Sequence, residues 1–205
     1  MNKKFYLFFS FFDRNLFEKV SLFRKKIIDK YYCIKFEANS LSKGIAGIQA
    51  PCTLLGLKYV DFQSFSSGPY LRIECIDDYY GQAFSPNLKI GSGVAVGYNC
   101  HIGVINEVKI EDNVLIGSNV LITDHSHGKN SIEELHIPPV CRKLFSKGTV
   151  VIKKGVWIGD NCSILPGADI GENSVIACNS VVNKVIPPNC IAAGIPAKPI
   201  KYLKL

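Results

Sequence analysis

A six-residue repeat near the end of the chain constrains its fold more than any other feature. Aliphatic residues recur there at uninterrupted intervals of six: Ile152, Ile158, Ile164, Ile170, Ile176 and Val182. Small residues stand four positions after several of them: Cys162, Ala168, Ser174 and Ser180. An amphipathic helix repeats at 3.6 residues and a single strand at 2, so neither explains a period of six. This period is typical of a parallel β-helix, in which each short strand pairs with its equivalents in neighbouring coils.

The repeat predicts an all-β solenoid whose long aliphatic side chains point inward and stack, with Gly or Asn at its corners. Fainter hexads begin near Ile48, so we expect the coil to occupy residues 46–190. Ser40 to Gly44 has the composition of a linker, which separates an N-terminal segment, residues 1–45. Residues 191–205 form a C-terminal tail.

The repeat is interrupted at two places, where we expect a functional site. It is suspended for about 30 residues between Ile122 and Ile152. Excursion loops of this length are usually functional. It also slips by two residues between Ile102 and Ile110, which predicts an irregular corner at residues 104–106.

The long excursion opens with a polar turn, Asp124-His125-Ser126-His127. An unperturbed histidine titrates near neutral pH and serves as a general base without large tuning. A site for acid–base chemistry is therefore the sharper interpretation of this turn. The plainer one is a polar cap on a coil.

The net charge of +7 is concentrated at the N-terminus. Residues 1–35 hold nine Lys or Arg against three Asp or Glu, while residues 36–205 hold fifteen against fourteen. The nearly neutral main body argues against nucleic-acid binding. The apolar run near Phe8 is far shorter than the roughly 20 residues needed to span a bilayer, and no signal-peptide cleavage site follows it.

Two interpretations of residues 1–35 stay open. They form a basic amphipathic helix that packs against the body or a neighbouring subunit, or one that lies on an anionic membrane surface. The second places the protein peripherally on the inner face of the membrane.

The eight cysteines show neither a CxxC pair nor metal-ligand spacing. Several fall on repeat positions that a coil would bury, where a free cysteine behaves as a small hydrophobic residue. We therefore expect free thiols in a reducing, cytoplasmic compartment and no metal site.

Several motifs together resemble one known family. They are VKIEDNVLIG at 108–117, ITDHSHG at 122–128, VWIGDN at 156–161, ILPG at 164–167, IPPN at 186–189 and AGIPAK at 193–198. The stretch from about Phe65 to Leu203 resembles the hexapeptide-repeat acyltransferases. Within them it resembles the maltose and galactoside acetyltransferases and, more closely, bacterial O-antigen or capsular-polysaccharide O-acetyltransferases.

The resemblance implies a left-handed parallel β-helix, a homotrimer with active sites between subunits, and acetyl-CoA as the donor. The implied acceptor is a sugar hydroxyl of a surface polysaccharide or of its lipid-linked precursor. Acetyl transfer to a hydroxyl needs a general base and a hydrogen-bond donor that stabilises the oxyanion. It does not require a covalent acyl-enzyme.

The resemblance also implies roles for individual residues. The family's catalytic histidine lies five residues after the apolar residue of its hexad, which singles out His127 from Ile122, with His125 as second candidate. Asp124 and Asn106 are the candidate substrate contacts, because the acceptor-binding asparagine of the galactoside enzymes falls on Gly97 here. The candidate contacts to acetyl-CoA are Trp157, the backbone amide of Cys178, Lys198 and Lys201.

Three alternative functions remain at this stage. An N-acetyltransferase acting on an amino sugar or nucleotide sugar would use the same base. A zinc hydratase resembling the γ-class carbonic anhydrases would use His101, His125 and His127 as metal ligands. A non-catalytic assembly scaffold would bind no acetyl-CoA.

Overall fold

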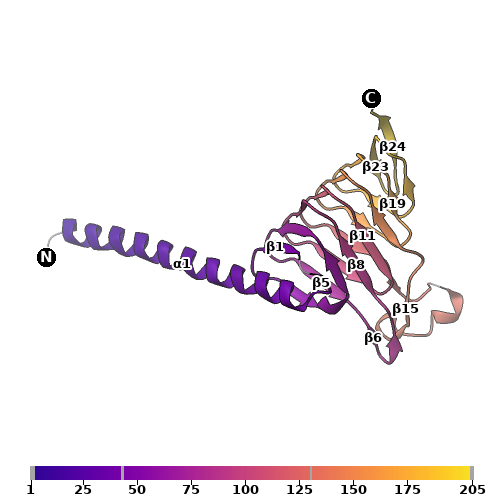
Figure 1. Cartoon of the computed structure of the whole chain (residues 1–205), viewed down its shortest axis with the longest axis horizontal. Helices are drawn as coiled ribbons and strands as arrows, with labels where there is room; N and C mark the ends of the chain where they lie inside the picture. The colour runs from indigo at the N-terminus through magenta and orange to yellow at the C-terminus, as the bar shows by residue number, and fades with distance from the viewer. Residues whose placement is uncertain (1–2, 43, 130, 204–205) are drawn as a thin grey trace.

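A long helix followed by three mainly parallel sheets makes up most of the protein (Figure 1). The structure, a computed structural model, describes residues 3–42, 44–129 and 131–203, with side chains from residue 16 onward except that of Phe17. Helix α1 spans Lys3–Asn39. The N-terminal helix and the parallel strands predicted from the sequence are confirmed.

The three sheets form the three sides of the coil. Sheet 1 contains β1 (Ile45–Ile48), β4 (Ser64–Ser67), β9 (Val94–Val96), β12 (Leu115–Ile116), β17 (Trp157–Ile158), β20 (Val175–Ile176), β23 (Cys190–Gly194) and β24 (Ala197–Tyr202). Sheet 2 contains β2 (Thr53–Leu55), β5 (Arg72–Cys75), β10 (His101–Val104), β13 (Leu121–Thr123), β18 (Ser163–Ile164) and β21 (Val181–Val182). Sheet 3 contains β3 (Val60–Phe62), β8 (Asn87–Ile90), β11 (Glu107–Ile110), β16 (Val150–Ile152), β19 (Asp169–Ile170) and β22 (Val185–Ile186).

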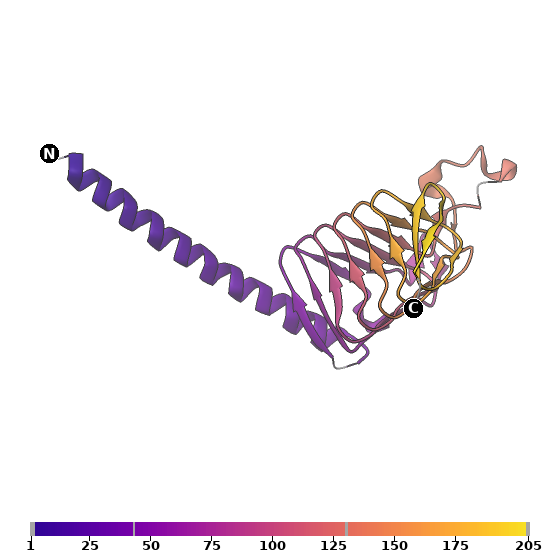
Figure 2. The same cartoon turned by 90° about the horizontal axis from the view of Figure 1, so that it is seen from above.

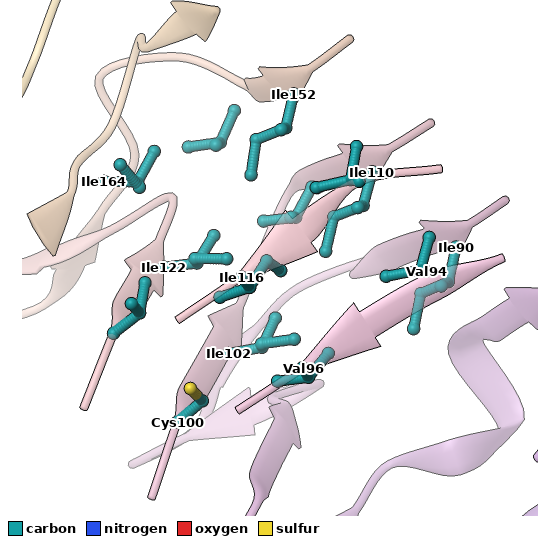
Figure 3. Packing of buried hydrophobic residues seen from close by; sticks show 14 of the residues in the cluster. Ile90, Val94, Val96, Cys100, Ile102, Ile110, Ile116, Ile122, Ile152 and Ile164 are labelled. Carbon is teal, nitrogen blue, oxygen red and sulfur yellow. The ribbon is translucent and has the colours of Figure 1, made fainter. Parts of the chain in front are cut away.

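The chain passes from sheet 1 to sheet 2 to sheet 3 and then returns to sheet 1 one coil further on (Figure 2). Ile152, Ile158 and Ile164 pair with the residues three hexads later, Ile170, Ile176 and Val182, respectively. These side chains are buried and stack along the interior of the coil (Figure 3). Each six-residue repeat therefore forms one of the three sides of a coil, and three repeats complete one coil.

Asparagines occupy many of the corners of the coil in the left-handed region of φ. Seven of them have φ between 53° and 60°: Asn99, Asn113, Asn119, Asn161, Asn173, Asn179 and Asn189. Their side chains also bond from coil to coil, with Asn99 Nδ2 donating to Asn119 Oδ1 at 3.0 Å. Asparagine tolerates this conformation better than most residues, so the corners follow from the sequence.

The last turns of α1 cover the free edge of β1. Asp29, Cys33 and Glu37 lie four residues apart on one face and accept the backbone N–H groups of Ala50, Ile48 and Ala46, respectively. An uncovered edge strand can pair with another chain and cause aggregation. The helix prevents this by covering the edge of the first coil. Phe36 is fully buried against Phe62 and Phe65.

The rest of α1 projects away from the coil (Figure 1). Its apolar side chains are exposed, with Leu22 at 60%, Phe23 at 65% and Ile27 at 55%. Residues 29–37 of the helix thus pack against the body, as one of the two interpretations of this segment predicts. Within the described residues, no helix combines the length and apolarity required to cross a membrane.

Two excursions leave the coil and contact each other. The first is the hairpin of β6 (Asp78–Tyr79) and β7 (Gln82–Ala83). The second is the long predicted excursion, which carries β14 (Ser126–His127), β15 (Leu144–Phe145) and two 3-10 turns, Ile132–Glu134 and Pro139–Cys141. Gln82 Nε2 donates to Leu144 O at 3.1 Å, so the hairpin braces the loop.

All eight cysteines are free. Cys75, Cys100, Cys162 and Cys190 are buried in the core, as the repeat predicts, whereas Cys141 and Cys178 are exposed. Burial raises the pKa of the Cys75 thiol to about 12. Such a thiol stays protonated and behaves as a packing residue.

Candidate active site

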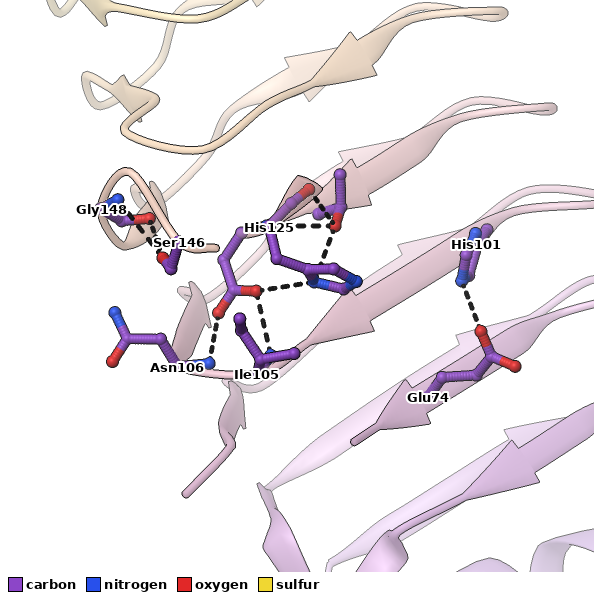
Figure 4. A network of polar contacts seen from close by, with 9 residues as sticks. Glu74, His101, Ile105, Asn106, His125, Ser146 and Gly148 are labelled. Carbon is purple, nitrogen blue, oxygen red and sulfur yellow. Dashed lines mark hydrogen bonds and ion pairs between the residues drawn. The ribbon is translucent and has the colours of Figure 1, made fainter. Parts of the chain in front are cut away.

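His125 and its buried neighbour Asp124 lie where sheet 2 ends and the long excursion begins (Figure 4). His125 Nδ1 is 3.1 Å from Asp124 Oδ1 and 3.1 Å from Thr123 Oγ1. The Asp124 side chain is fully buried, while the His125 side chain is 13% exposed. One ring nitrogen is thus fixed from inside the protein.

The irregular corner before β11 holds the Asp124 carboxylate. Oδ1 accepts the backbone N–H of Ile105 at 3.0 Å, and Oδ2 accepts that of Asn106 at 2.7 Å. A buried carboxylate requires such partners to remain charged. The two-residue slip in the repeat therefore supplies the amides that hold the carboxylate behind His125.

The tautomer of His125 follows from this geometry. An ionised carboxylate only accepts hydrogen bonds, so Nδ1 carries the proton that points at Asp124. Nε2 is then left with its lone pair. A histidine held in this way by a buried aspartate is positioned to remove a proton from a hydroxyl.

Gly103 lies beneath the ring of His125. A Cβ at this position would lie 3.2 Å from His125 Cε1 and 3.4 Å from His101 Nε2. His101 in turn is 3.1 Å from Glu74 Oε2, which also binds Arg72 at 2.6 Å. Glycine at this position therefore lets the two imidazoles approach the strand closely, because a side chain would press on both rings.

The charges of this group have definite directions. Burial, followed by the Arg72 charge, lowers the pKa of His101 despite the neighbouring Glu74. Burial raises the pKa of Glu74, but the hydrogen bond and charge of Arg72 outweigh it, so the net shift is downward. Glu74 is therefore ionised and His101 neutral near pH 7.

His127 lies in a different environment. Its side chain is exposed on β14, and its Nδ1 is 3.3 Å from Tyr79 Oη. The tyrosine hydroxyl donates to Val140 O at 2.7 Å, and the two rings meet edge to face. Asp124 contacts His125 instead, and the orienting neighbour of His127 is Tyr79.

Within one chain, the candidate histidines lie in two different places. Among the residues that the structure describes, no group of three His, Cys, Asp or Glu side chains is arranged to hold a metal ion. His101 and His125 flank Gly103, while His127 contacts the hairpin.

The candidate substrate contacts are placed differently from each other. Asn106 is exposed at the irregular corner, and its side chain points away from the His125 ring (Figure 4). Asp124 has no exposed surface, and both of its oxygens are bound to protein groups. Its carboxylate is therefore placed to orient His125 and not to touch a substrate.

The candidate donor contacts lie on another side of the coil. Trp157 is 51% exposed on β17 of sheet 1. Cys178 follows β20 of the same sheet, and Lys198 and Lys201 are exposed on β24. The base, by contrast, lies at the corner between sheets 2 and 3. The structure of one chain does not bring the two groups together.

Sequence reasoning missed Arg72, Glu74, Gly103 and Tyr79. The first three point outward on β5 and β10, whose inward residues Ile73 and Ile102 pair across adjacent coils. The hairpin is inserted between these two strands, so their sequence spacing is not a multiple of six. In the sequence, only the alternation of polar or small residues around Ile73 and Ile102 indicates that Arg72, Glu74 and Gly103 point outward.

Comparison with known proteins identifies the family. Residues 149–184 match the model described as bacterial transferase hexapeptide (six repeats), and residues 107–123 match the hexapeptide repeat of succinyl-transferase. The chain is 39% identical to the putative lipopolysaccharide biosynthesis O-acetyl transferase WbbJ of Escherichia coli K12 over 162 residues, which cover 75% of this chain and 77% of that protein.

Two further comparisons concern galactoside acetyltransferases. The chain is 36% identical over 126 residues to galactoside O-acetyltransferase of Escherichia coli K12, which covers 59% of this chain and 57% of that one. A solved galactoside acetyltransferase in complex with coenzyme A is 30% identical, with a TM-score of 0.52 over 68% of this chain and 66% of that chain. The chain thus spans little more than half of the first and about two thirds of the second.

The protein belongs to the hexapeptide-repeat acetyltransferase family. It is therefore an acyltransferase, and the resemblance stated from the motifs is confirmed.

Proposed function

We propose that this protein is an acetyl-CoA-dependent O-acetyltransferase that modifies a sugar hydroxyl in the biosynthesis of a surface polysaccharide. One observation carries the proposal: buried Asp124 holds Nδ1 of His125 and leaves Nε2 for the proton of the acceptor hydroxyl. The relatives named above are O-acetyltransferases, and one of their structures contains coenzyme A.

We assign the general base to His125 and not to His127, which the count along the repeat favours. His125 Nε2 takes the proton of the acceptor hydroxyl as its oxygen attacks the thioester carbonyl carbon. The tetrahedral oxyanion collapses, the C–S bond breaks, and the CoA thiolate takes the proton from His125. The backbone amide of Cys178 is the proposed donor to the oxyanion.

The donor would bind along sheet 1, with Trp157 beside its pantetheine or adenine arm and Lys198 and Lys201 near its phosphates. Acetyl-CoA is anionic, and both lysines are exposed on β24. The candidate acceptor contact Asn106 lies at the other side of the base.

The proposed assembly is a homotrimer of left-handed β-helices with active sites between subunits. Two observations support it. The donor contacts and the base lie on different sides of one chain, so a second copy is needed to bring them together. Sheet 3 also carries exposed ion pairs, Lys89–Glu107 and Lys153–Asp169, which suit a solvent-facing side.

The projecting part of α1 is the proposed membrane contact. Arg24, Lys25 and Lys26 stand among the exposed apolar residues Phe23 and Ile27. Basic and apolar groups on one helix bind anionic headgroups and the acyl boundary together. The enzyme would then act in the cytoplasm, where free thiols stay reduced, at the inner face of the membrane.

Binding to vesicles tests the membrane contact. Intact protein should sediment with vesicles containing phosphatidylserine, less so at high salt, and a Phe23→Ser/Ile27→Ser variant should not. Lys109→Gln on sheet 3 is the control for charge alone. If the Phe23→Ser/Ile27→Ser variant binds vesicles as well as the Lys109→Gln control, the proposed membrane contact is wrong. If the Phe23→Ser/Ile27→Ser variant has a lower oligomeric state in sedimentation, this surface contacts a neighbouring subunit.

Polysaccharide chemistry tests the enzymatic proposal. Host polysaccharide from cells with and without the protein should differ by O-acetyl groups in mass spectrometry. The purified protein should restore them from acetyl-CoA, with release of the CoA thiol. Acetyl groups on nitrogen, or an unchanged polysaccharide, would overturn the proposal.

A further inference from the structure

A polar groove continues along sheet 2 from the candidate base toward the first coils. A cavity of about 350 Å³ is lined by residues that include Thr53, Tyr70, Arg72, Asn99 and His101. Thr53, Arg72 and His101 are register partners on the adjacent strands β2, β5 and β10, so their side chains form one row. No step of the mechanism uses this row.

The groove and the site of chemistry are continuous. His101 lines the groove, and its ring and the ring of His125 both lie against Gly103. From β13, which leads to His125, to β2 there are three strand steps, or about 14 Å at the usual strand spacing. This length accommodates more than one pyranose ring.

The groove offers fixed hydrogen-bonding groups with no net charge. Glu74 holds both Arg72 and His101, at 2.6 Å and 3.1 Å. Arg72 and Glu74 cancel one another, and His101 is neutral with Nδ1 left as an acceptor, because Nε2 donates to Glu74. A phosphate or a nucleotide diphosphate would find no unpaired cation in this row, whereas sugar hydroxyls find donors and acceptors.

An aromatic side chain lies at the edge of the groove. Tyr70 is 51% exposed and meets Tyr98 edge to face, with ring centroids 5.2 Å apart. The apolar face of a pyranose packs on such a ring while its hydroxyls bond to polar neighbours. Asn99 donates its amide N–H to Asn119, which leaves its carbonyl oxygen as an acceptor.

We propose that this groove binds the sugar residue next to the one that is acetylated, so that the acceptor is an uncharged glycan of at least two residues. This inference rests on the proposed O-acetyltransferase function and narrows its substrate. A free monosaccharide would leave the groove empty, and a nucleotide sugar would bring a charge that the groove does not match.

The test uses glycan from the host polysaccharide, de-O-acetylated by mild base, partly hydrolysed and separated by length. We would measure kcat/KM for acetyl transfer from acetyl-CoA to each length. It should rise about tenfold from one to two residues, the scale of one hydrogen bond to a charged group. Tyr70→Ala should abolish this rise and leave kcat/KM for the monosaccharide within about twofold, and Arg72→Met should also abolish the rise.

Two variants serve as matched controls and should keep the full rise. Lys89→Met removes an exposed ion pair on sheet 3, and Tyr31→Ala removes one ring of an edge-to-face pair on α1. Tyr70 is exposed, so its variant remains informative if Arg72→Met fails to fold.

The outcomes separate the inference from the proposed function. A kcat/KM that does not depend on glycan length would overturn the assignment of the groove as a glycan-binding site, and so would an equal loss of kcat/KM for all lengths in Tyr70→Ala. Either result would leave the proposed O-acetyltransferase function in place. A preference for the nucleotide-linked monosaccharide would also overturn the assignment of the groove. No transfer to any fraction would remove the proposed function, and the groove with it.

Discussion

Two histidines separated by one residue lie in opposite surroundings. His125 is mostly buried, and its Nδ1 is held by a carboxylate that is itself held by two backbone amides. His127 is exposed and contacts a tyrosine hydroxyl on a hairpin that is not part of the coil. The rigid coil fixes the first ring, and two excursions that rest on each other hold the second.

The difference teaches that the neighbours of a histidine decide its use as a base more than its place in a motif. Preorganised donors and acceptors lower a barrier because they need no rearrangement during the reaction. His125 has such neighbours in the coil. The neighbour of His127 is the Tyr79 hydroxyl, which also donates to Val140 O, so we propose that His127 joins the excursion to the hairpin.

The largest expected effect comes from Asp124→Asn. The new amide group would face a backbone N–H and reverse the tautomer of His125, so kcat should fall by about 10² to 10³-fold. Steady-state kinetics measure kcat, and circular dichroism checks the fold. A kcat within threefold of the parent would show that the buried carboxylate does not set up the base.

Gly103→Ala should have a smaller effect. Its Cβ would lie 3.2 Å from His125 Cε1, so the ring must shift by a few tenths of an ångström. We expect kcat to fall by about tenfold, since proton transfer depends on small displacements. Gly47→Ala is the matched control, because its Cβ would make an ordinary 3.7 Å contact with Ser66. Equal activity of the two variants would contradict the position assigned to the ring.

Tyr79→Phe tests the other side of the comparison. It removes the hydrogen bonds to Val140 O and His127. We expect kcat to change by less than about threefold and the free energy of unfolding to fall only slightly. Amide hydrogen exchange should speed up in the long excursion. A loss of activity as large as that of Asp124→Asn would assign chemistry to the His127 side.

The smallest expected effect is a pH dependence of stability at His101, which faces Glu74, Arg72 and His125. Its pKa is lowered by burial and by Arg72, so the unfolded chain binds a proton more readily near the ordinary value of 6.5. The free energy of unfolding should therefore decrease as pH falls through this range. Urea denaturation should show a weaker decrease in His101→Gln. An equal decrease in both proteins would mean that His101 is not held neutral.

The sequence predicts the coil well and the site only in part. Six-residue spacing fixes the inward residues such as Ile158 and Ile176, because identical coils stack in register. It also locates both interruptions. It does not show that Ile105 and Asn106 bind Asp124, because a bond between two irregular corners follows no period. Counting from Ile122 identifies a position in the chain, whereas burial and partners distinguish His125 from His127.

A side-by-side measurement of kcat for His125→Ala and His127→Ala tests the central claim most directly, with acetyl-CoA and de-O-acetylated host glycan as substrates. Circular dichroism checks that both variants fold. We predict a loss of at least about 10²-fold in His125→Ala and less than about threefold in His127→Ala. The reverse order would contradict the assignment and return the base to His127.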